Sequence, residues 1–154
     1  MGRFLCGSQS VLAMAALGCG LAAFEHSLPL GGMAALRQKS LALTDAFIGL
    51  VQTHCAGHGL VLETPLAHAQ RGSQVSFSRH DGAYAVVQAL IERQVIGDFR
   101  AGNPSWGEPH IMRFGFTPLY VGFEDVWRAV AALKDVLDSG SWRDPRFAIP
   151  NPVT

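Results

Sequence analysis

One arginine stands at a position where a charged side chain is unusual. Arg113 lies in the middle of the segment 111–116 (IMRFGF), between the apolar side chains of Met112 and Phe114. A guanidinium is costly to bury unless it meets an anion. Two interpretations stay open for Arg113: a structural salt bridge, or a clamp for a carboxylate or phosphate, which its planar fork of donors suits.

The other residues that could do chemistry are less well placed. His54 and His58 have the spacing of two metal ligands on a helix, but Gly57 and Gly59 set His58 beyond the expected helix end and no carboxylate joins them. We therefore expect no metal site. A nucleophilic serine in a G-x-S-x-G context and a glycine-rich phosphate loop are both absent from the sequence.

Composition and charge narrow the classes of partner. The chain has 154 residues, 49% of them apolar, with a formal net charge of +0. This length and composition predict one soluble domain. The neutral net charge provides neither a basic surface for nucleic acid nor an attraction to an acidic membrane surface. Three cysteines at irregular spacing favour a reducing compartment, the cytoplasm, and we interpret them as small buried apolar residues. They are Cys6, Cys19 and Cys55.

The amino-terminal segment has two interpretations. Arg3 followed by the apolar run 11–17 resembles a secretory leader, which would make the chain an exported domain with an unrelated role. The alternative, which we favour, is an Ala- and Leu-rich core helix. No apolar run is expected to approach the roughly 20 residues that span a bilayer.

Periodicity predicts the elements that must position Arg113. A long amphipathic helix is expected over 33–55, a helix capped by Asp81 follows, and a last helix runs over 123–139 with Gly140 as its C-cap. Strands are expected at 60–62, 74–79, just after 95–97 and at 111–116. This order predicts an α/β (α+β-like) layer in which helices cover one face of a small, mostly antiparallel sheet.

Four blocks in one order carry a resemblance to a known family. They are LRQKSLALTDAFI (36–48), RGSQVSF (71–77), VIGDFRA (95–101) and RFGFTPLYVGFEDVWRAV (113–130). Together, over residues 3–142, they resemble the carboxyl-terminal part of kynureninase. The resemblance implies the C-terminal domain of a pyridoxal-phosphate enzyme with the aspartate-aminotransferase-like fold, related to the class V aminotransferases.

The resemblance also implies a function. Kynureninases are cytoplasmic homodimers that hydrolyse L-kynurenine, or its 3-hydroxy derivative, to anthranilate or 3-hydroxyanthranilate and L-alanine, in tryptophan catabolism and NAD biosynthesis. We therefore expect pyridoxal 5'-phosphate as cofactor and kynurenine as substrate, with no nucleic acid and no membrane as partner.

Two residues match functional positions of the family. Arg113 corresponds to the arginine that holds the substrate α-carboxylate, and Ser8 aligns with a residue that contacts the cofactor phosphate. The family usually carries two prolines where this chain has Gln9 and Ser10. The segment 102–110, which contains Trp106, is longer than the family's usual link and could act as a lid or stand idle.

The family's Schiff-base lysine has no counterpart in the matched segments. The chain contains only Lys39 and Lys134, and neither matches it. We expect this chain alone to show no turnover. It is then either the terminal portion of a kynureninase, active when joined to the lysine-bearing portion, or a non-catalytic remnant or partner fragment of an intact subunit.

The resemblance implies three parts of the chain. Residues 1–32 would be a remnant of the large cofactor-binding domain, ending in a helix that exposes a wide apolar surface without its partners. Residues 33–142 would form the small domain with its long linking helix. Residues 143–154 would be an unstructured or loosely docked tail.

Overall fold

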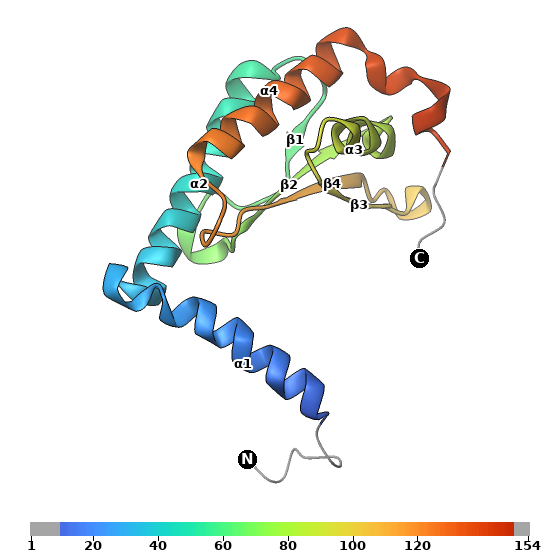
Figure 1. Ribbon diagram of the computed structural model, residues 1–154. Coiled ribbons are helices and arrows are strands. Elements are labelled where there is room, and N and C mark those ends of the chain that lie inside the picture. The colour runs from blue at the N-terminus through green and yellow to red at the C-terminus, as the bar shows by residue number, and fades with distance from the viewer. Residues whose placement is uncertain (1–9, 150–154) are drawn as a thin grey trace. The chain divides into compact units, whose positions relative to one another are not determined.

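A computed structural model describes residues 10–149 of the chain (Figure 1). The chain divides into two compact units, Met1–Gln38 and Lys39–Thr154. Helix α1 (Val11–Glu25) and the short helix η2 (Leu28–Leu30) belong to the first unit, while helix α2 (Gly32–His54) begins in the first and continues into the second.

Helix α1 is apolar on all sides. Ser10 caps its start, because the Ser10 hydroxyl accepts a hydrogen bond from the Ala13 N–H at 3.4 Å. None of its residues is buried. By length and composition alone the segment Val11–Leu30 could cross a membrane, a test that core helices and signal sequences also pass. The expectation that no apolar run approaches that length was therefore wrong.

The second unit contains one antiparallel sheet of four strands in the order β1-β2-β4-β3. These strands are β1 (Val61–Leu62), β2 (Gln74–Arg79), β3 (Asp98–Arg100) and β4 (His110–Gly115). All three pairings are antiparallel, and Ser76 and Asp98 lie opposite Arg113 from the two sides of β4. The predicted small antiparallel sheet is confirmed.

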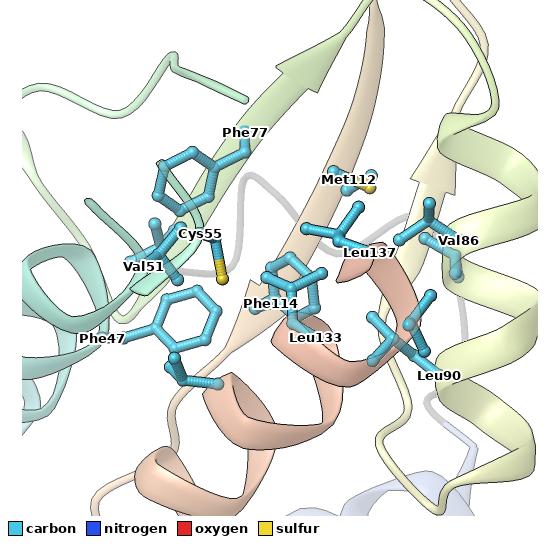
Figure 2. Packing of buried hydrophobic residues seen from close by; sticks show 14 of the residues in the cluster. Phe47, Val51, Cys55, Phe77, Val86, Leu90, Met112, Phe114, Leu133 and Leu137 are labelled. Carbon is cyan, nitrogen blue, oxygen red and sulfur yellow. The ribbon is translucent and has the colours of Figure 1, made fainter. Parts of the chain in front are cut away.

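Helices cover one face of this sheet. Figure 1 shows α2, α3 (Ala83–Glu92) and α4 (Phe123–Ser139) on the same side of the strands. In Figure 2, Phe47 and Val51 of α2 point toward Phe77 of β2, while Leu133 of α4 lies beside Phe114 of β4. The aromatic ring of Phe47 lies 5.1 Å from that of Phe114, centroid to centroid. Since these residues are 5% exposed or less, the sheet has one dry, packed face.

The helix ends explain where the chain turns. Gly140 ends α4 in the left-handed conformation, as the sequence predicts. Asp81 was expected to cap α3, but the cap is Gly82, at φ 70°, with no side-chain hydrogen bond. A left-handed cap residue suits glycine, and it leaves the Asp81 carbonyl to accept a hydrogen bond from Arg79 Nη1 at 2.7 Å.

The segment after α4 is docked on the packed unit. Two short helices, η5 (Ser141–Arg143) and η6 (Pro145–Phe147), bury Trp142 and Phe147. The Arg79 guanidinium lies 4.3 Å from the centroid of the Trp142 ring. The expectation of an unstructured or loosely docked tail is therefore wrong for residues 143–147, which end η5, form η6 and bury Phe147.

Candidate functional site

Arg113 lies on the face of the sheet that the helices leave uncovered. Side chains alternate along β4, so Met112 and Phe114 enter the packed core while Arg113 points the other way. The strand register places residues of two neighbouring strands on the same side. We call this surface the open face, and it is defined by Gln74, Ser76, Asp98, Arg100 and Arg113.

Two neighbours hold the Arg113 guanidinium. Its Nη1 lies 3.2 Å from Oδ2 of Asp98 on β3, and its Nη2 donates a hydrogen bond of 2.8 Å to Oε1 of Gln74 on β2. The structure thus supplies a carboxylate from within the chain, and the salt-bridge interpretation of Arg113 describes a real contact. The contact uses only part of the guanidinium, however.

The remaining donors of Arg113 decide what it can bind. A guanidinium carries five N–H donors. Gln74 accepts a hydrogen bond from Nη2, whereas Asp98 forms an ion pair with Nη1. The side chain is 33% exposed, whereas its Nε is buried and has no acceptor among the described residues. At least one N–H on each of Nη1 and Nη2 has no acceptor among the described residues, and two such donors can bind a carboxylate at two points.

The partners of Arg113 were not predicted from the sequence. The alternation of side chains along β2 and β3 could have predicted that Gln74 and Asp98 lie on the uncovered face of the sheet. Their pairing with Arg113 depends on the register of three strands that are distant in the sequence.

Both lysines are occupied by other contacts. Lys39 Nζ donates to the Pro118 carbonyl oxygen at 2.7 Å, and Lys134 pairs with Asp138 four residues further along α4. Neither contact forms part of the open face. Ser8, the other residue for which the resemblance implies a role, lies outside the described residues.

His54 and His58, the candidate metal ligands, each contact a different partner. His58 Nε2 lies 2.8 Å from Asp138 Oδ1, and the ring of His54 meets the edge of Trp127 at 5.6 Å. Within residues 10–149, no group of three or more His, Cys, Asp or Glu side chains could hold a metal ion. Hydrogen bonds from Lys134 and His58 lower the pKa of Asp138.

A second charged cluster, which was not predicted from the sequence, joins Asp45, His68 and Arg71. Arg71 is buried and pairs with Asp45 of α2, whose Oδ2 lies 2.9 Å from His68 Nε2. Burial by itself would raise the pKa of Asp45, but the hydrogen bonds from Arg71 and His68 outweigh it and lower that pKa. The cluster ties α2 to the segment before β2.

Two further expectations concern single residues. Trp106, in the short helix η4 (Pro104–Trp106), is 78% exposed and covers no site in this structure. Cys55 is buried as expected, and burial raises the pKa of its thiol. Cys19 is exposed, which corrects the expectation that it is buried, because α1 has no buried residue. Cys6 lies outside the described residues.

The comparisons with known proteins agree on one family. Residues 36–133 match the family model described as the kynureninase C-terminal domain. The chain is 54% identical over 152 residues to kynureninases of Burkholderia mallei and Burkholderia pseudomallei, and 51% identical to that of Pseudomonas fluorescens. Each match covers 99% of this chain but 34% of the relative, so the chain spans about one third of the length of these curated relatives. A match over most of the second unit, Arg113 included, shows that the chain belongs to the kynureninase family.

Proposed function

We propose that this chain is the C-terminal portion of a kynureninase, which hydrolyses L-kynurenine to anthranilate and L-alanine. The observation that carries the proposal is the half-buried, partly engaged guanidinium of Arg113 on the open face of the sheet. The kynureninase relatives named above support the choice of reaction. The 3-hydroxy derivative of kynurenine is the second substrate of the proposal.

In this proposal Arg113 binds the α-carboxylate of the substrate. The two N–H groups left on Nη1 and Nη2 would donate to the two carboxylate oxygens, which fixes the position and the orientation of the amino acid portion. A lysine at this position could offer only a compact point charge, so it would not reproduce the two-point geometry. The role of Arg113 is therefore to orient the substrate.

The cofactor of the proposal is pyridoxal 5'-phosphate, and the described residues do not form its site. A Schiff base needs a lysine that faces the cofactor, yet Lys39 is bound to a carbonyl oxygen and Lys134 to a carboxylate. We propose that the lysine and most of the phosphate ligands belong to the part of the relatives that this chain does not span, with Ser8 as one contact to the phosphate. The family's homodimer and cytoplasmic location are part of the same proposal.

A complementation experiment tests the proposed function. The chain is co-expressed with the lysine-bearing remainder of the Burkholderia mallei kynureninase, and anthranilate formation from L-kynurenine is followed by fluorescence. We expect turnover from the complemented pair and none from either part alone. In the pair, Arg113→Met should lower kcat/KM by at least about a hundredfold, since a charge-assisted, two-point contact is lost.

The matched control for this experiment is Arg128→Met. Arg128 pairs with Glu124 on the exposed side of α4 and takes no part in the open face, so its replacement should leave kcat/KM within about twofold. Turnover by the isolated chain would contradict the proposed division of the active site. Full activity of the complemented Arg113→Met variant would remove Arg113 from the proposal.

A second candidate is a non-catalytic partner of an intact subunit. The observation that favours it is that both lysines are engaged elsewhere: Lys39 binds the Pro118 carbonyl oxygen, and Lys134 binds the Asp138 carboxylate. This candidate predicts that the chain binds the intact relative without adding activity. Size-exclusion chromatography of the mixture, together with a failed complementation, would select it over the enzyme portion.

A further inference from the structure

A continuous set of polar contacts crosses the open face from β2 to β3. Gln74 Nε2 donates to Ser76 Oγ at 3.2 Å, and Gln74 Oε1 accepts from Arg113 Nη2. Asp98 Oδ2 then lies 3.2 Å from Arg113 Nη1 and 2.9 Å from Arg100 Nη2. Two side chains, Gln74 and Asp98, therefore contact the Arg113 guanidinium, and each of them is held by one further side chain, Ser76 or Arg100.

Each neighbour of Arg113 is itself anchored. The hydrogen bond to Ser76 sets the orientation of the Gln74 amide, so that its oxygen and not its nitrogen faces the guanidinium. Arg100 binds the same Asp98 oxygen that faces Arg113, and it compensates part of the carboxylate charge. When a ligand binds Arg113, Gln74 and Asp98 are therefore already held in place, by Ser76 and by Arg100.

We infer that Asp98, anchored by Arg100, is a positioning residue that holds the Arg113 guanidinium for two-point binding of a monocarboxylate. The inference deepens the proposed function and rests on it for the ligand. Gln74 accepts from Nη2, Asp98 faces Nη1, and Nε is buried, so the donors left for a ligand lie on Nη1 and Nη2. Two donors on neighbouring nitrogens suit a ligand with two coplanar oxygens, such as a carboxylate.

A positioning role for Asp98 and its negative charge predict opposite changes in carboxylate affinity when Asp98 is removed. Asp98 is a negative charge next to the proposed carboxylate site, so by charge alone its removal should strengthen carboxylate binding. If Asp98 positions Arg113, its removal should weaken binding, since the guanidinium must then be ordered when the ligand arrives. The sign of the change therefore separates a positioning residue from a competing charge.

The first measurement needs no ligand. In the 154-residue chain labelled at arginine, NMR exchange gives the rate at which the Arg113 guanidinium rotates about its Nε–Cζ bond. We expect Asp98→Asn to raise this rate by up to about tenfold, since the guanidinium loses its ion pair with Asp98. The control is Asp135→Asn, which removes a comparable pair with Arg93 outside the open face and should leave Arg113 unchanged. An unchanged rate in Asp98→Asn would overturn the inference.

The second measurement uses L-alanine as the carboxylate probe and alaninamide as the probe without a carboxylate. We expect saturable shifts of the Arg113 Nη signals with L-alanine only, and a binding constant about three- to tenfold weaker in Asp98→Asn. Tighter binding in Asp98→Asn would overturn the inference and make Asp98 a competitor. No saturable shift in the wild-type chain would instead count against the proposed function, and the rotation rate would still decide the role of Asp98.

A second variant covers the case in which Asp98→Asn does not fold. Arg100 is 62% exposed at its side chain, so Arg100→Gln should fold normally. It frees the far side of Asp98, and we expect changes in the same direction as for Asp98→Asn but about two- to threefold in size. If Asp98→Asn does not fold, an unaltered rotation rate in Arg100→Gln would overturn the inference.

Discussion

The two faces of one sheet differ in what holds their side chains. On the packed face, β4 contributes Met112 and Phe114, which are at most 5% exposed and lie against helices. On the open face, the same strand contributes Arg113, held by Gln74 and Asp98 through polar contacts. A single six-residue strand therefore supplies both a part of the core and the candidate site, because its side chains alternate.

This difference separates stability from binding. Contacts on the packed face are apolar and exclude water, so their loss should cost stability directly. Contacts on the open face involve half-exposed charges, whose contribution to stability is small. Substitutions on the packed face should therefore change the free energy of unfolding, whereas substitutions on the open face should change ligand binding.

The largest effect is expected at the centre of the packed face. Phe47 is 0% exposed, and its ring lies 4.8 Å from that of Phe116 and 6.1 Å from that of Phe77. We expect Phe47→Ala to lower the free energy of unfolding by about 3–5 kcal/mol, because it leaves a cavity among these rings. Urea unfolding of the chain, followed by circular dichroism, measures the change.

The control for Phe47→Ala lies on the other face. Arg113→Met should change the free energy of unfolding by less than about 1 kcal/mol, since its ion pair with Asp98 is partly exposed. Equal losses of stability in the two variants would contradict the separation between the faces.

An intermediate effect is expected where the packed face is closed by Trp142. A Cβ added at Gly82 would lie 2.2 Å from the Trp142 ring, and Gly82 has φ 70°. Gly82→Ala should therefore destabilise the chain by about 1–3 kcal/mol and change the tryptophan fluorescence. Gly49→Ala is the matched control, because Gly49 lies within α2 and an added Cβ would meet open space. This substitution should stabilise the chain by about 0.5–1 kcal/mol. A neutral Gly82→Ala would mean that Trp142 is loosely held.

A pH-dependent effect is expected at the Asp45 cluster. The pKa of Asp45 is lowered, so its stabilising contribution is present above the ordinary carboxyl pKa of about 3.9 and disappears as pH falls through the lower folded-state value. At pH 7, Asp45→Asn should destabilise by about 1–3 kcal/mol, since the buried Arg71 loses a charged partner. The two unfolding curves should converge as the pH falls below the lowered pKa of Asp45.

Asp135→Asn provides the comparison for Asp45→Asn. Asp135 also pairs with an arginine, Arg93, but it is 62% exposed at its side chain. Its replacement should cost less than about 0.5 kcal/mol at any pH between 4 and 8, on the scale of surface ion pairs. A difference between wild type and Asp45→Asn that persists unchanged at low pH would show that the Asp45 charge does not contribute.

Local patterns predicted most of the elements. The 3.6-residue period from Met33 to Cys55 corresponds to α2, and the alternation of Val75 and Phe77 corresponds to β2. The bounds of the last helix, Phe123–Ser139, and its Gly140 cap agree with the prediction. These features depend on neighbours within a few residues, where propensity and periodicity act.

Contacts between distant residues were not predicted. Arg71 is separated from Asp45 by 26 residues and Arg113 from Gln74 by 39, and no short-range pattern joins either pair. The packing of Trp142 against Arg79 and Gly82 on other elements, and the docking of residues 143–147 after it, were not predicted for the same reason. Proline-rich composition alone indicated a tail.

The sequence by itself determined the family, the order of helices and strands, and the placing of Arg113 among the apolar residues of a strand. Only the tertiary structure decided that Arg113 is held from two sides, by Gln74 of β2 and Asp98 of β3. The physical reason is that strand register is a long-range property. A shift of one residue would move Asp98 to the packed face and leave Arg113 without its carboxylate partner.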